Sequence, residues 1–222
     1  FNNDYEKIHN WSVRYPLNFW NSIWDFSKIK GEKNKIKLKK SSKFYRNIFL
    51  PKSKLNFSEN LLSKNTNEKA ITFISENSYR ETRNWNELNK NVKKVAFYLK
   101  KLNIISKDRV AAYMPNTIET AEAFLGTVSL GAIWSSCSPD FGINGVVERF
   151  SQIKPKVLFV TNEYFYNGKK INILERISEI IKKLPSIKHL IILNYPGQPK
   201  IKKILTYKNV KTHNWNDLIK QN

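Results

Sequence analysis

Residues Arg109 to Ser136 have the sequence RVAAYMPNTIETAEAFLGTVSLGAIWSS, which predicts a buried strand, a helix and a second strand in direct succession. Pro115 ends the first apolar run, and Asn116 can cap the helix that follows. Gly131 would end this helix in a left-handed turn. Two short apolar strands joined by a helix are typical of a parallel pair in a sheet.

The same alternation of strands and helices continues on both sides of this stretch. Upstream, residues 70–75 and 79–82 predict strands around a turn at 76–78. A helix follows, with apolar positions at helical spacing: Leu88, Val92, Val95, Ala96 and Leu99. Downstream, a helix ends before Pro155, strands are predicted at 157–160 and 189–193, and a helix is predicted at 173–184. We therefore predict an α/β fold with a layered, mostly parallel sheet and helices on both faces. Ligands of such sheets bind beyond the carboxyl ends of the strands, here after Met114, Ser136 and Val160.

The composition changes once, near residues 65–68. Residues 1–66 are aromatic and basic without a sustained period, and we expect them to form a cap segment that packs on the main domain. Residues 67–222 are expected to be the first part of a large N-terminal α/β domain. The chain begins with Phe1, and a predicted helix has only just begun at Trp215, so we expect a fragment of a longer protein.

The formal net charge is +21, which could indicate binding to nucleic acid or to an anionic membrane. However, the Lys residues are spread from Lys7 to Lys220, and only seven of the 39 basic residues are Arg. Lys, Asn and Ile are all abundant, which favours the interpretation that the high charge reflects the codon bias of an AT-rich genome. The densest basic run, residues 28–43, is expected to be a solvated loop. A basic binding module remains the alternative from a different functional class.

Cysteine and histidine usage indicates neither a disulfide framework nor a metal site. Cys137 is the only cysteine, and the three histidines show no metal-ligand spacing. No secretory signal opens the sequence, and the longest uncharged stretch, residues 123–139, is broken by Gly, Thr and Ser. We expect a cytoplasmic protein without a membrane span.

Several segments, in order, resemble one enzyme family. They are KDRVAAYMPN (107–116), SLGAIWSSCSPDFG (129–142), VERF (147–150), QIKPKVLF (152–159) and the upstream WSV (11–13), FW (19–20) and LNFSENLL (55–62). Together they are similar to the AMP-forming acyl-CoA synthetases, and in particular to the acetoacetyl-CoA synthetases. The alternative within this class is an acetyl- or propionyl-CoA synthetase.

The resemblance implies a ligase of lipid and ketone-body metabolism whose substrates are the small molecules acetoacetate, ATP and coenzyme A, with Mg2+ as a cofactor. The complete enzyme would make an acyl-adenylate and transfer the acyl group to coenzyme A, with no nucleic acid as partner. The family holds phosphates on a Gly/Ser/Thr-rich loop followed by Lys. The seven glycines of this chain form no such loop. We therefore assign no catalytic residue and expect this chain alone to be inactive and to bind no cofactor tightly.

The resemblance also suggests two candidate contacts with coenzyme A. Ser138, Pro139 and Asp140 occupy the place of a turn near the pantetheine arm, although the relatives have Gly where this chain has Pro and Asp. Lys169 and Lys170 occupy a place where relatives carry basic residues against the phosphates. A purely structural turn and a solvated basic turn are the respective alternatives.

Overall fold

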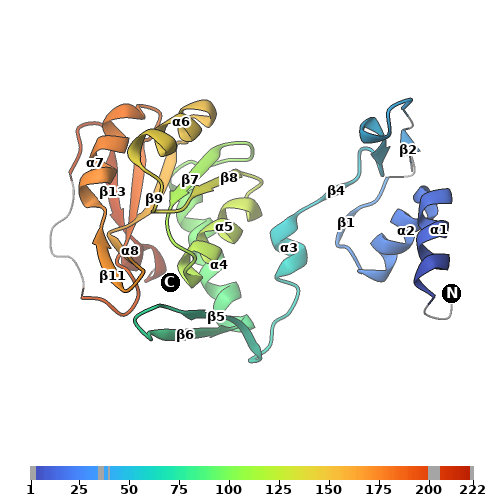
Figure 1. The fold of residues 1–222 in the computed structure, drawn as a ribbon, viewed down its shortest axis with the longest axis horizontal. Helices are drawn as coiled ribbons and strands as arrows, with labels where there is room; N and C mark the ends of the chain where they lie inside the picture. The colour runs from blue at the N-terminus through green and yellow to red at the C-terminus, as the bar shows by residue number, and fades with distance from the viewer. Residues whose placement is uncertain (1–3, 35–37, 40, 200–205, 221–222) are drawn as a thin grey trace. The chain divides into compact units, whose positions relative to one another are not determined.

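The computed structural model describes residues 4–34, 38–39, 41–199 and 206–220 (Figure 1). The chain divides into two compact units, Phe1–Leu61 and Leu62–Asn222. Each unit has its own helices and strands and is described by itself.

The first unit is built from short elements held together by aromatic side chains. Its helices are α1 (Tyr5–Arg14), α2 (Pro16–Phe26), a 3-10 turn (Phe44–Arg46) and α3 (Phe57–Leu61). Two antiparallel pairs join β1 (Gly31–Glu32) to β4 (Lys54–Leu55) and β2 (Leu38–Lys39) to β3 (Ile48–Phe49). Trp20 packs on Phe49 with a ring-centroid separation of 5.9 Å, which links α2 to β3.

The second unit contains a five-stranded, all-parallel sheet in the order β13-β12-β9-β7-β8. Its strands are β7 (Arg109–Tyr113), β8 (Ile133–Cys137), β9 (Val157–Thr161), β12 (His189–Leu193) and β13 (Lys211–Asn214). All five residues of the central strand β9 are buried. Both faces of a parallel sheet are covered, which is why its inner strands are continuous apolar runs. The predicted fold class is confirmed.

Helices cover both faces of this sheet (Figure 1). One core packs α4 (Trp85–Lys101), α5 (Ile118–Ser129) and α8 (Trp215–Ile219) on alternate strand residues such as Val110 and Phe159. The other packs α6 (Ile143–Ile153) and α7 (Leu174–Lys183) on the intervening residues, such as Ala111 and Leu158. The alternation follows from the two-residue period of a strand.

The ends of the central helices show one difference from the sequence-based expectation. Thr117, not Asn116, is the N-cap of α5, because its hydroxyl accepts a hydrogen bond from the Thr120 amide at 3.3 Å. The predicted end at Gly131 is confirmed by its φ of +70°. Asn84 caps α4 in a reciprocal capping box with Glu87.

A separate hairpin of β5 (Lys69–Ile74) and β6 (Arg80–Asn84) matches the two upstream strands that were predicted. Two further features were not predicted: the hairpin of β10 (Glu163–Tyr166) and β11 (Lys169–Asn172), and the edge strand β13. β11 and β13 are short and mostly polar, so they carry no apolar run for a sequence pattern to detect. β10 has the sequence EYFY, a short aromatic run that was not recognised as a strand.

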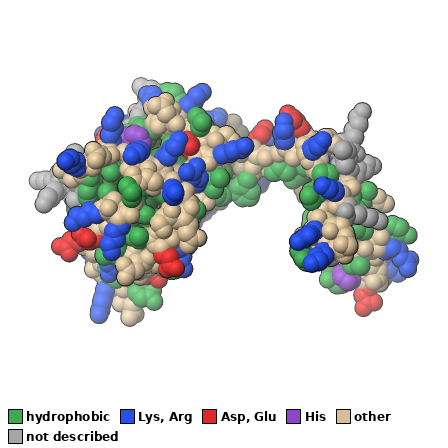
Figure 2. Space-filling view, turned by 90° about the horizontal axis from the view of Figure 1, so that it is seen from above, with side chains coloured by type: hydrophobic (Ala, Val, Ile, Leu, Met, Phe, Trp, Pro, Cys, Tyr) green, Lys and Arg blue, Asp and Glu red, His purple; other side chains and the backbone are tan. Residues whose placement is uncertain are grey.

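Lys and Arg side chains are spread over the visible face of each unit rather than gathered in one place (Figure 2). Within the basic run 28–43, residues 35–37 and 40 lie outside the described residues. None of the helices in the described ranges is both long and apolar enough to cross a bilayer.

Candidate functional site

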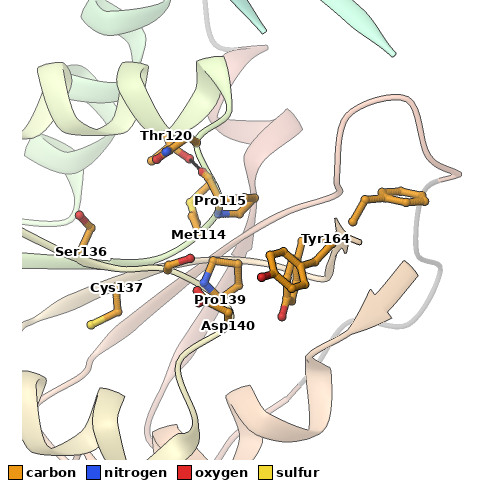
Figure 3. Close-up of a pocket in the computed structure, with 12 residues that line it drawn as sticks. Met114, Pro115, Thr120, Ser136, Cys137, Pro139, Asp140 and Tyr164 are labelled. Carbon is orange, nitrogen blue, oxygen red and sulfur yellow. Dashed lines mark hydrogen bonds between the residues drawn. The ribbon is translucent and has the colours of Figure 1, made fainter. Parts of the chain in front are cut away.

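A pocket of about 260 Å³ lies at the carboxyl ends of the parallel strands, where the sequence predicted a ligand site (Figure 3). It is lined by Thr120 of α5 and by three segments: residues 114–116 after β7, residues 136–140 at the end of β8, and residues 164–166 of β10. Pro115, Pro139 and Tyr164 lie close together in Figure 3. The pocket therefore draws its walls from consecutive strand ends, as expected for a parallel sheet.

The turn after β8 contains the predicted residues Ser138, Pro139 and Asp140. The Phe141 amide donates a hydrogen bond to the Ser138 carbonyl oxygen at 3.1 Å, which closes a four-residue turn. Pro139 occupies the second position of this turn, where its fixed φ is favourable.

Tyr113, at the end of β7, stabilises this turn through its hydroxyl group. Its phenol oxygen lies 2.8 Å from the Pro139 carbonyl oxygen and 2.7 Å from that of Phe141. Arg176 of α7 also donates to the Pro139 carbonyl, at 3.3 Å. Burial raises the pKa of the Tyr113 phenol, so the group stays protonated and remains a donor. The turn is thus held by two side chains from different elements.

Cys137 precedes the turn but offers no nucleophile. Its side chain is buried, and its sulfur points away from Pro139 and Tyr164 (Figure 3). Burial raises the pKa of the thiol, which disfavours the reactive thiolate.

The hairpin β10–β11 supplies the opposite wall of the pocket. Asn167 and Gly168 form its two-residue turn with φ values of +50° and +69°. Two consecutive positive φ angles are typical of the type I′ turn that Asn-Gly favours. The Gly168 amide donates to Glu76 Oε2 at 3.0 Å, which fastens the tip of the hairpin to the turn between β5 and β6.

The register of this hairpin places Lys169 and Lys170 on opposite faces. Lys169 pairs with Tyr166 and Lys170 with Phe165. Because successive side chains alternate across a strand, Lys169 shares the face of Tyr164 and Tyr166.

Lys170 shares its face with Glu163, and its ammonium lies 2.9 Å from Glu163 Oε1. The Glu163 side chain is only 8% exposed. It also donates to Gln198 Oε1 at 3.1 Å. Lys169 is exposed and has no ion pair or side-chain hydrogen bond within the part of the chain that the structure describes. The two adjacent lysines thus have different surroundings.

The structure brings Ser138, Pro139 and Asp140 together with β10 around one pocket, and the register places Lys169 beside Tyr166 of its wall. Sequence reasoning assigned no role to Tyr113, although it lies within the segment KDRVAAYMPN, or to Arg176, which lies in none of the quoted segments. Both act through the turn. Sequence reasoning also missed the hairpin, although the Asn-Gly dipeptide at 167–168 is a recognised hairpin signal. Within the described ranges, no three His, Cys, Asp or Glu side chains are grouped as ligands for a metal ion.

Comparison with known proteins gives the relationships of this chain. A profile of the AMP-binding enzyme family matches residues 59–218. The chain belongs to the AMP-binding enzyme family.

Acetoacetyl-coenzyme A synthetase of Rhizobium meliloti is 41% identical over 196 residues, which cover 87% of this chain and 30% of the relative. Acetoacetyl-CoA synthetase of Xenopus tropicalis is 38% identical over 198 residues, covering 86% of this chain and 29% of the relative. The solved structure of acetoacetyl-CoA synthetase from Streptomyces lividans superimposes with a TM-score of 0.85 at 26% identity, covering 98% of this chain and 33% of that one. The resemblance to acetoacetyl-CoA synthetases is confirmed, and the chain spans about 30% of the length of these relatives.

Proposed function

We propose that this chain is the N-terminal part of an AMP-forming acetoacetate–CoA ligase, and that the pocket at the strand ends forms part of its coenzyme A site. The observation that carries the proposal is the 41% identity to an acetoacetyl-CoA synthetase over 87% of this chain, including the strand ends that line the pocket. In this reaction ATP activates acetoacetate as an adenylate with release of pyrophosphate, and the thiol of coenzyme A then displaces AMP.

The residues of the pocket are compatible with part of coenzyme A. The turn at Ser138 to Asp140 is fixed by Tyr113 and Arg176, so it presents a constant surface to the pantetheine arm. Lys169 has an exposed ammonium beside Tyr166 and, unlike the paired Lys170, is available to a phosphate. A Lys ammonium acts as a point charge in such contacts.

Lys170 has a different role in this proposal, because its ammonium already pairs with Glu163 and Gln198. We infer that Lys170 holds the hairpin in place while Lys169 meets a phosphate group. The alternation of side chains across β11 supports this division.

No step of adenylate formation is assigned to a residue of this chain. The sequence contains no Gly/Ser/Thr-rich loop followed by Lys, and its described residues offer no group of three metal ligands for Mg2+. ATP and Mg2+ would be bound by other parts of the complete enzyme. The 222-residue chain by itself should therefore fail to exchange pyrophosphate into ATP with acetoacetate, and exchange above a no-protein control would contradict the proposal.

The coenzyme A site is tested by Lys169→Ala in the complete enzyme. Loss of one charge-assisted contact costs about 1 to 3 kcal/mol, or roughly a 5- to 150-fold rise in the Michaelis constant for coenzyme A. Pyrophosphate exchange, which precedes coenzyme A binding, should change little. The matched control is Lys93→Ala, which changes an exposed lysine of α4 that does not line the pocket. An unchanged Michaelis constant in Lys169→Ala would favour a solvated basic turn instead.

A further inference from the structure

A second pocket of about 280 Å³ lies apart from the strand-end pocket and takes no part in the proposed function. Its walls come from β6, α4, α5, α8 and the segment after β12. Three carboxylates line it, from Glu81 on β6 and from Glu119 and Glu122 on α5. Arg83 is the one Lys or Arg side chain among the described residues that line it.

The single guanidinium of Arg83 serves all three carboxylates. It contacts the Glu81 carboxylate directly and lies 3.8 Å from Glu119 Oε1 and 3.6 Å from Glu122 Oε1. Tyr79 donates a further hydrogen bond to Glu81 Oε2 at 2.9 Å. Glu81 is therefore well satisfied, whereas the two glutamates of α5 have only distant ion pairs.

The two glutamates of α5 each keep one oxygen without a partner. Their side chains are 8% and 1% exposed for Glu119 and Glu122 respectively. Asn91 of α4 donates to Glu122 Oε1 at 2.7 Å. Oε2 of Glu122 and Oε2 of Glu119 are buried and accept no hydrogen bond from the described residues. A buried carboxylate oxygen without a donor is unfavourable, and a cationic donor would satisfy it best.

We propose that this pocket binds an ammonium or guanidinium group, which donates hydrogen bonds to the unpartnered oxygens of Glu122 and Glu119. With Arg83 and one bound cation, the pocket would hold two positive charges against three carboxylates. Charge repulsion therefore does not exclude a bound cation. The volume accommodates a short alkyl amine, a methylguanidine, or the end of a Lys or Arg side chain from a polypeptide.

Other charged groups near the pocket do not satisfy these oxygens. Lys94 of α4 donates to the carbonyl oxygen of Ile219, at 2.6 Å, and forms no ion pair among the described residues with the glutamates of α5. Without a ligand, burial raises the pKa of Glu122 to about 8, because the loss of solvation outweighs the attraction of the Arg83 guanidinium. Burial also raises the pKa of Glu119. At neutral pH the empty pocket thus holds a proton that an entering cation would displace.

Isothermal titration calorimetry of the full chain with butylammonium and methylguanidinium tests the proposal. Amines and guanidines stay protonated from pH 6 to 8, so only the pocket titrates. We expect affinity to rise about tenfold between pH 6 and 7 and one proton to be released, detected in two buffers of different ionisation enthalpy. The neutral isostere 1-butanol should not bind.

Two further arms identify the source of the cation and the residue that binds it. Nα-acetyl-lysine amide and Nα-acetyl-arginine amide, whose side chains remain charged, represent the side chain of a polypeptide. If they bind and the free alkyl cations do not, the ligand comes from a protein segment. Glu122→Gln should weaken binding at least tenfold and abolish proton release, whereas the exposed control Glu175→Gln should not.

If Glu122→Gln does not fold, carboxyl-carbon NMR of the unmodified chain provides the readout, because the ligand should lower the titration midpoint of Glu122. Equal responses to butylammonium and 1-butanol, or binding without proton release, would overturn the proposal. Unchanged affinity in a folded Glu122→Gln would do the same.

Discussion

Replacement of Tyr113 by Phe tests whether a single buried hydroxyl holds the pocket turn. The ring is fully buried, so Phe fills the same space and only the hydroxyl is lost. That oxygen lies 2.8 Å and 2.7 Å from the carbonyl oxygens of Pro139 and Phe141. Arg176 would still donate to the Pro139 carbonyl, at 3.3 Å, whereas the Phe141 carbonyl would lose this hydrogen bond.

Removing one partner from a buried hydrogen bond costs about 1 to 3 kcal/mol. We expect the free energy of unfolding of Tyr113→Phe, measured by urea titration, to fall within this range. The matched control is Tyr166→Phe, since the Tyr166 side chain is 60% exposed and should change stability by less than about 0.5 kcal/mol.

A local measurement separates loss of the turn from a general loss of stability. Hydrogen exchange of the Phe141 amide, which bonds to the Ser138 carbonyl oxygen, should accelerate more in Tyr113→Phe than exchange in the centre of β9. If Tyr113→Phe and Tyr166→Phe are equally stable and the Phe141 amide is unaffected, the hydroxyl does not hold the turn.

Three other outcomes are expected. Gly126→Ala should destabilise the second unit by about 1 to 3 kcal/mol in urea titration, because a Cβ would lie 2.5 Å from Val95 Cγ1; an unchanged midpoint would show that α4 can move away. Lys170→Ala should lower the free energy of unfolding by about 1 kcal/mol, because the buried carboxylate of Glu163 would lose its cation. Lys169→Ala should have no effect on stability. Equal effects would argue against different roles for the two lysines. Burial raises the pKa of Glu122 to about 8, above its unfolded value near 4.5. Between these two values the folded state binds a proton that the unfolded state does not bind. The free energy of unfolding should therefore fall as pH rises from 7 to 9. Glu122→Gln should flatten this dependence, and a parent chain with constant stability over that range would refute the assignment.

The sequence by itself determined the main sheet, because its inner strands are short apolar runs separated by amphipathic helices. The segments 157–160 and 189–193 were predicted as strands and are observed as β9 and β12. Burial on both faces requires apolar residues at every position of such strands, so the pattern is visible without the structure. The sequence also contained the family resemblance and the turn at Ser138 to Asp140.

Only the tertiary structure decided which side chains meet. The edge strand β13 has the sequence KTHN, whose pairing with β12 is set by the sheet rather than by any apolar period. The different surroundings of Lys169 and Lys170 follow from the register of the hairpin, since a shift of one residue would exchange their faces. Glu119 and Glu122 are three residues apart on α5, but their shared pocket with Arg83 exists because α5 and β6 both pack against α4. Contacts between distant segments depend on how the elements pack, and no local pattern in the sequence encodes them.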